Sequence, residues 1–219
     1  MKLTQDVYLV GGGDYGFNLT HRLDCHTYLV DGGDELALVD AGFGPGTHEI
    51  LEVIRADGFD PARISKIVVT HYHADHVGGA AALKRATGAR LLAGVEAAPT
   101  IRVADADQIG LNWAKTFGFY PADYEWEPAE VDEEFSDGTR IRVGDLELEA
   151  VATPGHCMGH YCIRLRGHGR TYRTPARPPP DLVAERAPSR GGGCARVQPH
   201  RAPEGSPPLA MSSAERSSL

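Results

Sequence analysis

The sequence predicts an α/β domain in its first 172 residues, followed by a segment of a different kind. Two patterns support this prediction. Short runs rich in β-branched residues alternate with segments whose apolar residues recur at helical spacing, and glycines separate many of them. With 42% hydrophobic and 24% charged residues, the 219-residue chain can bury one core. From Arg173 onward neither pattern continues.

Three strands are expected near the N-terminus, followed by a helix with clear end signals. Ile50, Val53 and Ile54 recur at helical spacing. Thr47 is expected to cap this helix and Gly58 to end it. The three preceding strands are expected over residues 7–10, 27–30 and 35–40.

The centre of the chain continues the alternation of strands and helices. The run ISKIVVT at residues 64–70 is mostly β-branched, as in buried strands. A helix is expected over residues 77–88, ending at Gly88, and a strand over residues 89–94. The later strands are expected to form a hairpin over residues 139–143 and 146–153, joined at Gly144-Asp145, and an alternating strand over residues 161–166.

The run VVTHYHADHVGG holds four side chains of metal-ligand type, His71, His73, Asp75 and His76. On an extended segment, positions i and i+2 point the same way, so His71 and His73 can hold one ion together. Asp75 and His76 follow the turn and face a second point, which indicates two adjacent metal ions. Neutral imidazole and carboxylate suit Zn²⁺, with iron or manganese as alternatives. A solvated polar loop is the competing interpretation, but the preceding strand and the following glycine pair favour a metal site.

These residues resemble the signature of a known family. The run from His71 to His76 matches the H-x-H-x-D-H signature of the metallo-β-lactamase superfamily. LVDAG at residues 38–42 is similar to the strand and turn that precede this signature in the family. TPGHCMGH at residues 153–160 resembles an element of the glyoxalase II and lactonase branches, where His156 would be the third ligand of the first metal. The resemblance covers about residues 7–172.

The resemblance implies an α/β (α+β) fold of the metallo-β-lactamase type, an αββα sandwich with the site at the sheet edges. It implies that a hydroxide between two metal ions attacks a substrate carbonyl, with Asp75 as the catalytic residue. Asp40 would orient a ligand imidazole. The metal ligands that it implies are His71, His73 and His156 for one Zn²⁺ ion, and Asp75 and His76 for a second.

The expected activity is metal-dependent hydrolysis of a thioester, an ester or a lactone in a small-molecule substrate. The alternatives are a mononuclear iron persulfide dioxygenase and an inactive metal-binding remnant. The family bridges its two metals with a further Asp in a Gly-Asp turn, and a later His completes the second metal site. Here a strand cannot pass through Pro178-Pro179-Pro180 inside a sheet, and Asp181 and His200 lie in unsuitable surroundings. We therefore expect the second half of the sandwich to be incomplete.

Residues 173–219 contain no Lys, Ile, Phe, Tyr or Trp and hold nine of the 15 prolines. Such a segment cannot bury enough apolar area to offset its ordering entropy, so we expect a disordered tail. Its Pro, Arg, Ala, Gly and Ser content is typical of a GC-rich gene read out of frame. A frameshift near codon 172 is the interpretation we favour, with an authentic tail as the alternative.

Charge and composition limit the expected partners and location. The net charge of −8, with no basic patch before residue 170, argues against nucleic acid. No apolar run approaches the ~20 residues that span a membrane, and the first residues lack the pattern of a secretory signal. The four cysteines form no C-x-x-C pair, so a cytoplasmic location is expected. The oligomeric state is not predicted.

Several other features have competing interpretations. GGGDYG at residues 11–16 spells the dinucleotide pattern G-x-G-x-x-G, but a hairpin turn is favoured because a strand follows too soon. The aromatic block at residues 113–126 is interpreted either as a lid over an apolar substrate or as an insertion that packs on the core. We expect Tyr72 to be a packing residue. Side chains expected to be structural or solvated are Cys157, Cys162, His21, His26, His48, His160 and His168.

Overall fold

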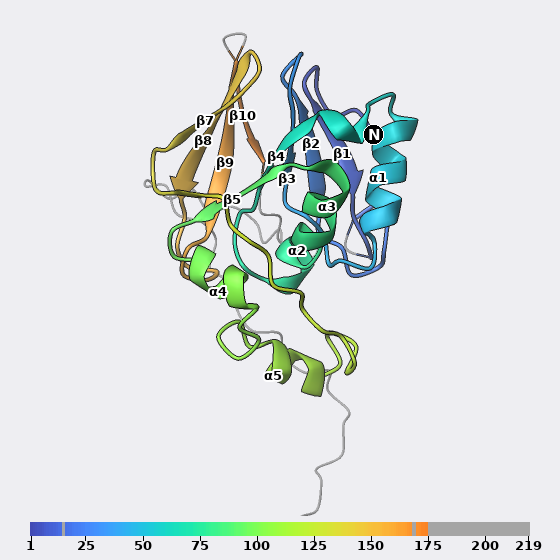
Figure 1. Ribbon diagram of the computed structural model, residues 1–219, viewed down its shortest axis with the longest axis vertical. Helices are drawn as coiled ribbons and strands as arrows, with labels where there is room; N and C mark the ends of the chain where they lie inside the picture. Colours follow the sequence, from blue (N-terminus) through green and yellow to red (C-terminus); the bar gives the residue numbers. More distant parts are fainter. Residues whose placement is uncertain (15, 168–169, 175–219) are drawn as a thin grey trace, which may run out of the picture.

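The structure is a computed structural model and describes residues 1–174, apart from residue 15 and residues 168–169 (Figure 1). The strands are β1 (Val7–Gly11), β2 (Thr27–Asp31), β3 (Leu36–Val39), β4 (Ile64–Val68), β5 (Arg90–Gly94), β6 (Glu133–Phe135), β7 (Arg140–Val143), β8 (Leu146–Ala152), β9 (Tyr161–Gly167) and β10 (Arg170–Thr174). The helices are α1 (Thr47–Ala56), the short 3-10 helix η1 (Pro61–Arg63), α2 (Ala74–Val77), α3 (Ala80–Thr87), α4 (Ala98–Val103) and α5 (Leu111–Thr116). The expected tail beyond Thr174 lies outside the described residues.

The first sheet has the strand order β1-β2-β3-β4-β5-β6. β1, β2 and β3 pair antiparallel, whereas β3 to β6 pair in parallel. Parallel neighbours require crossover connections, and these contain α1 between β3 and β4 and α3 between β4 and β5. Since parallel strands end at the same edge, the loops after β3, β4 and β5 all open at one edge of the sheet.

The second sheet has the order β10-β9-β8-β7, and all of its strands are antiparallel. The turn between β7 and β8 lies against the turn between β2 and β3. A Cβ atom on Gly144, whose φ is +54°, would come within 2.0 Å of the carbonyl oxygen of Gly32. Only glycine therefore fits this contact between the two sheets.

Two apolar cores lie on opposite faces of the first sheet. The core between the sheets includes Val30, Val39, Val68, Val143 and Ile163. The core on the other face packs the first sheet against the helices, and it includes Leu29, Leu38, Ile50, Ile54, Ile67 and Leu83. Figure 1 shows α1 and α3 on the side of the first sheet that faces away from the second.

The outer face of the second sheet carries charged side chains. Glu149 on β8 pairs with Arg164 at 3.0 Å and with Arg166 at 2.7 Å, both on β9. Among the described residues, no helix covers this face (Figure 1). The described residues thus form the α, β and β layers of the expected αββα sandwich. The expectation of an incomplete second half concerns residues outside the described part of the chain and stays a prediction.

Most predicted elements are found within one or two residues of their expected ends. Gly88, at φ +74°, ends α3 as expected, and β7 and β8 form the expected hairpin. The expected cap of α1 is wrong: the N-cap residue is Gly46, and the hydroxyl of Thr47 instead donates to the carbonyl oxygen of Gly44 at 2.7 Å. Within the described residues, no helix is long and apolar enough to cross a bilayer.

The glycine-rich run at residues 11–16 opens the connection between β1 and β2. These two strands pair antiparallel with each other, and the described residues between them form no helix. The hairpin interpretation is therefore the correct one, and the run does not have the strand–turn–helix context of a dinucleotide site.

Candidate metal centre

The histidine loop lies at the edge where β3 and β4 end. The two strands pair in parallel, with Val39 opposite Val68. Directly after β3, Asp40 adopts a left-handed backbone conformation with φ of +64°, which Asp tolerates better than most residues. Its backbone N–H donates to the carbonyl oxygen of Val68 at 3.0 Å. This turn places Asp40 beside the chain that leaves β4.

The buried Asp40 carboxylate organises the residues around it. Its Oδ1 accepts hydrogen bonds from the backbone N–H of Thr70 at 2.7 Å and from the Thr70 hydroxyl at 2.9 Å. Its Oδ2 lies 2.9 Å from Nδ1 of His76. The Thr70 hydroxyl oxygen is also 3.0 Å from Nδ1 of His71. Asp40 therefore orients His76 directly and contacts His71 through Thr70.

Three imidazoles from two sheets converge next to this carboxylate. His71 and His73 follow β4, whereas His156 lies in the loop between β8 and β9. Nδ1 of His73 and Nε2 of His156 are 2.9 Å apart. One ring nitrogen from each of the three residues lies within 4.8 Å of the others. This arrangement can surround a single ion.

The chemistry of the three imidazoles fits a bound cation. Nε2 of His71 is buried and has no hydrogen-bond partner among the described residues, a state that costs about 1–3 kcal/mol unless a ligand satisfies the atom. Burial, with the neighbouring imidazoles, lowers the pKa of His71 well below its ordinary value and that of His73 to about 4. The pKa of His156 is lowered by the same causes. All three are neutral at pH 7, the form that binds zinc.

A second group of ligand-type side chains lies on the other side of His71. Asp75 and His76 are on the short helix α2, and Nε2 of His76 is 3.4 Å from Oδ2 of Asp75. Cys25, Asp40 and His76 each place one ligand-type atom within 4.8 Å of the others. Burial raises the pKa of the Cys25 thiol to about 11, so the thiol keeps its proton at neutral pH.

The protonation of His76 differs from that of the three clustered imidazoles. Burial alone would lower its pKa, but its acidic neighbours raise it well above the ordinary value, and among them Asp75 and Asp40 are the ones that carry charge at neutral pH. In the metal-free protein His76 is therefore an imidazolium whose charge is compensated by carboxylates. Asp75 and His76 can serve a second metal only after His76 has lost this proton.

The structure brings together all five ligands that the sequence suggested. They are His71, His73, Asp75, His76 and His156, and they meet at one edge of the sandwich. Metal binding by these residues remains a prediction. Asp181 and His200, the residues weighed as further ligands, lie outside the described part of the chain.

His160 was expected to be structural or solvated, and the structure places it against the three imidazoles. It is 3% exposed, its Nδ1 is 2.8 Å from the Thr153 hydroxyl, and its ring centroid is 5.0 Å from that of His71. Its Nε2 is buried without a partner in the described structure. The signal was present in the sequence, because His160 lies only four residues after His156 in TPGHCMGH.

Tyr120 is a second residue at the site that the sequence did not single out. Its hydroxyl donates to Oδ1 of Asp75 at 3.0 Å. The residue belongs to the aromatic block, for which a lid and a packing insertion were both considered. No local pattern around Tyr120 indicated that it would contact a residue 45 positions away.

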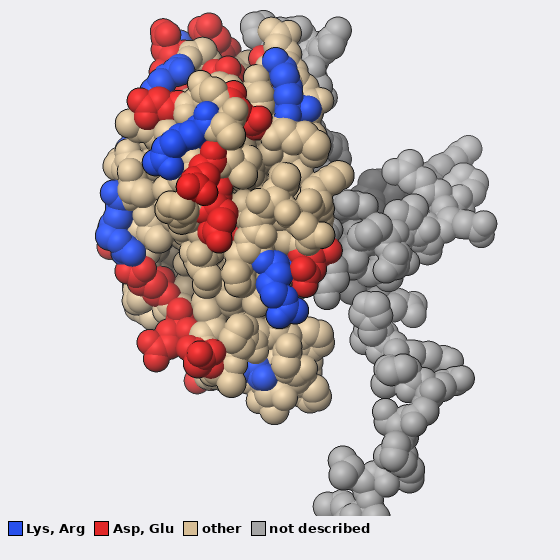
Figure 2. Space-filling model, turned by 90° about the vertical axis from the view of Figure 1, so that its right-hand side faces the viewer, with Lys and Arg blue, Asp and Glu red and all other residues tan. Residues whose placement is uncertain are grey.

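The rest of the aromatic block divides into buried and exposed members. Tyr124 and Trp126 belong to the core on the helix side, as a packing insertion would. Trp113, Phe117 and Phe119 are each at least 60% exposed. They lie on and just after α5, which Figure 1 shows at the lower end of the described chain. In Figure 2 the lower end of the described surface is tan in its middle, with acidic side chains to its left and basic ones to its right.

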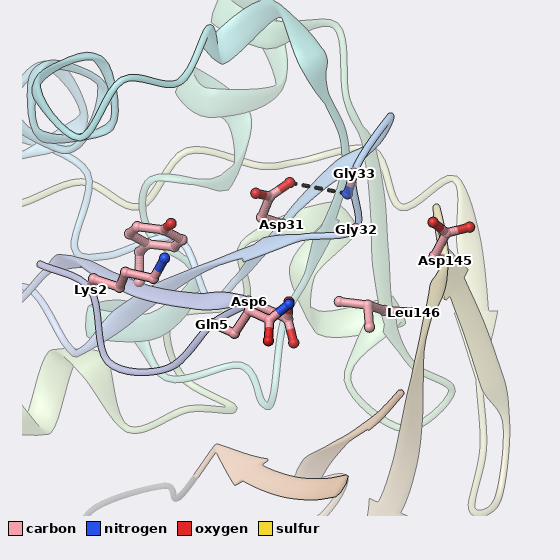
Figure 3. Close-up of a pocket in the computed structure, with 9 residues that line it drawn as sticks. Lys2, Gln5, Asp6, Asp31, Gly32, Gly33, Asp145 and Leu146 are labelled. Atoms are coloured by element: carbon pink, nitrogen blue, oxygen red, sulfur yellow. Dashed lines mark hydrogen bonds between the residues drawn. The ribbon is translucent and has the colours of Figure 1, made fainter. Parts of the chain in front are cut away.

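A polar pocket lies at the opposite end of the strands from the histidines. Lys2, Asp6, Asp31 and Asp145 contribute to its lining, and the N–H of Gly33 donates to Oδ1 of Asp31 at 3.1 Å (Figure 3). Gly32 and Gly33, in the turn before β3, line this pocket, whereas Asp40 follows the last residue of β3, so the two sites lie at different ends of the sandwich. None of the predicted site residues lines it.

Comparison with known proteins assigns this arrangement to a family. The family model described as the metallo-beta-lactamase superfamily matches residues 22–207, most of the chain. The chain belongs to the metallo-beta-lactamase superfamily. Among solved structures of this superfamily, the chain resembles the metallo-beta-lactamase with a HARLDQ motif from Cronobacter sakazakii, with a TM-score of 0.63 and 28% identity. That match covers 78% of this chain and 61% of the other.

A subclass B3 metallo-beta-lactamase of Bradyrhizobium japonicum is similar with a TM-score of 0.55 and 29% identity, over 68% of this chain and 53% of that one. Among curated superfamily relatives, a hydroxyacylglutathione hydrolase of Cereibacter sphaeroides (strain ATCC 17023) is 30% identical over 65% of this chain and 44% of its own length. The hydroxyacylglutathione hydrolase of Pseudomonas aeruginosa (strain PAO1) is 39% identical over 45% of this chain and 27% of its own length. The chain thus spans less than half of these two curated relatives.

Proposed function

We propose that the protein is a metal-dependent hydrolase of the glyoxalase II type that cleaves a thioester, with esters and lactones as related substrates. The observation that carries this proposal is the cluster of His71, His73 and His156, in which a buried Nε2 has no partner among the described atoms. The curated relatives named hydroxyacylglutathione hydrolase support a thioester as the substrate.

The three neutral imidazoles are the residues that would hold Zn²⁺. When bound, zinc supplies Lewis acidity, which polarises a carbonyl and lowers the pKa of water to about 7. Asp40 keeps the histidine loop in place through Thr70. Asp75, at the same edge, would serve the second metal position through Oδ2 and would orient the attacking water there. Its Oδ1 is engaged by the Tyr120 hydroxyl.

The test compares three substrate classes on one preparation of the full chain. The chain is freed of metal with a chelator and reloaded with Zn²⁺, Mn²⁺ or Fe²⁺. Hydrolysis of S-lactoylglutathione, a homoserine lactone and a β-lactam is then measured. We expect one tightly bound Zn²⁺ per chain and slow hydrolysis, fastest for the thioester, which stops when the metal is removed.

Two results would contradict the proposal. Stoichiometric zinc with no hydrolysis of any of these substrates would identify a metal-binding remnant. Iron in the purified protein, with consumption of oxygen in the presence of a persulfide, would identify a dioxygenase instead.

A further inference from the structure

Asp75 is held by contacts from three different parts of the chain. Its carbonyl oxygen accepts a hydrogen bond from the backbone N–H of Cys25 at 3.1 Å. Its Oδ2 faces Nε2 of His76 at 3.4 Å, and its Oδ1 accepts the hydrogen bond from Tyr120 at 3.0 Å. Of these contacts, only the one from Tyr120 comes from the aromatic block, far along the chain.

The ring of Tyr120 packs against the buried ring of Phe43. Its ring stacks on Phe43 with a centroid distance of 5.2 Å and an interplanar angle of 7°. Phe43 is 1% exposed, and its backbone N–H donates to Oδ1 of Asp24 at 2.8 Å. Packing on Phe43 therefore orients the Tyr120 ring so that its hydroxyl reaches Asp75. The Tyr120 hydroxyl is the donor in this contact, because an ionised carboxylate oxygen can only accept.

We propose that Tyr120 is a positioning residue, which fixes the Asp75 carboxylate through Oδ1 and leaves Oδ2 directed toward the second metal position. This inference rests on the proposed function, because it assigns Asp75 to a metal ion. Partners that orient a metal-ligating carboxylate typically contribute about 10–100-fold to metal affinity or activity. The contact also links the aromatic block to the metal centre, so that the position of the block and the geometry of the centre depend on each other.

The same segment offers a matched control. The Tyr124 ring also stacks on Phe43, with centroids 3.9 Å apart, and its hydroxyl donates to the Phe43 carbonyl oxygen at 3.0 Å. Tyr124→Phe and Tyr120→Phe thus remove the same hydroxyl group from neighbouring rings. Only Tyr120→Phe removes a contact with Asp75.

The experiment measures Co²⁺ binding to the full chain by visible absorption and calorimetry. Four variants are compared with the wild type: Tyr120→Phe, Tyr124→Phe, Asp75→Asn and the double variant Tyr120→Phe/Asp75→Asn. Far-UV circular dichroism and urea midpoints establish that each variant is folded. The binding that Asp75→Asn removes defines the part of the signal that depends on Asp75.

We expect Tyr120→Phe to weaken this Asp75-dependent binding at least about 10-fold and to shift its visible spectrum, whereas Tyr124→Phe leaves both unchanged. In the Asp75→Asn background, Tyr120→Phe should have no further effect, because the two residues act as one unit. A merely structural role of Tyr120 would give equal effects in both backgrounds.

Three results would overturn the proposal. They are equal effects of the two tyrosine variants, additive effects in the double variant, and Co²⁺ binding that does not depend on Asp75. The proposed function is tested separately by His71→Ala, which should abolish the tight Co²⁺ site whatever Tyr120 does. If His71→Ala abolishes the tight site and one of the three results is also obtained, the role of Tyr120 is rejected. The proposed function is not rejected by that outcome.

Discussion

The two groups of ligand-type side chains at the sheet edge differ in how well their polar atoms are satisfied. The cluster of His71, His73 and His156 consists of neutral imidazoles with lowered pKa values, and it includes a buried nitrogen with no hydrogen-bond partner among the described residues. In the group around His76, the carboxylates of Asp40 and Asp75 compensate an imidazolium.

Under the proposed function, this difference means that the two proposed metal positions are prepared to different extents. In the first cluster the three imidazoles are already neutral and close together, as binding of a cation would require. The second group is stable without a metal, because its charges already pair. A metal ion there must displace a proton from His76 and must compete with the hydrogen bonds within the group. We therefore expect strong, early occupation of the first position and weak occupation of the second.

The largest effect should come from breaking the first cluster. His71→Ala removes one of the three proposed ligands. Loss of a residue that only orients a ligand lowers metal affinity about 10–100-fold, so loss of a ligand itself should lower Zn²⁺ affinity more than about 100-fold. Isothermal titration with Zn²⁺ after chelation measures the effect. His48→Ala is the control, because His48 lies on the exposed side of α1 and contacts Glu52. Equal affinities in the two variants would remove His71 from the site.

A smaller effect should follow from changing the carboxylate that the two groups share. Asp40→Asn keeps the side-chain shape but cannot accept every hydrogen bond from Thr70 and His76. We expect it to lower the free energy of unfolding by about 1–3 kcal/mol, as buried groups lose partners. Urea denaturation of the metal-free protein measures this. The exposed Asp34→Asn serves as control, and a change below about 0.5 kcal/mol in Asp40→Asn would contradict the assigned role.

The smallest effect concerns the opposite end of the strands, where a carboxylate joins the two sheets. Burial would raise the pKa of Glu35, but hydrogen bonds from Lys66, Ser65 and the backbone N–H of Gly144 lower it from 4.5 to about 2. Because the folded pKa is depressed, its contribution to stability is present above about pH 4.5 and disappears as the pH falls toward 2. We expect Glu35→Gln to cost about 1 kcal/mol at pH 7, after allowance for solvent screening.

Urea denaturation from pH 7 to pH 3 tests this expectation. The stability difference between wild type and Glu35→Gln should shrink as the pH falls. Glu147→Gln is the matched control, because Glu147 pairs with Arg140 at 3.5 Å on an exposed surface. A difference that does not change with pH would mean that Glu35 contributes through packing and not through its charge.

The sequence predicted much of the first cluster, because its physical signals are local. A β-branched run identifies the buried strand β4, and His71 and His73 lie at the i, i+2 spacing that suits one ion. The resemblance of TPGHCMGH at residues 153–160 to an element of the family then indicated His156 as the third residue. The strands were found for the same reason, since alternation and turn glycines are properties of a few consecutive residues.

The remaining features depend on contacts that no local pattern contains. α4 and α5 have only six residues each, too few for a helical period to be visible. Thr47 has the composition of a cap, but Gly44 offers its hydroxyl a competing acceptor. Tyr120 reaches Asp75 only because stacking on Phe43 places its hydroxyl there.

The three clustered imidazoles have a further consequence, because they belong to both sheets. His73 and His156 are 83 positions apart in the chain, and an ion bound between them would cross-link the sandwich at its edge. Ligands that bind only the folded state stabilise it by about 2.7 kcal/mol at 100 times their dissociation constant. Among the described residues, no helix layer covers the second sheet. A metal ion bound between the two sheets would therefore help to hold the second sheet against the first. The stability of the folded chain would then depend on the concentration of free metal.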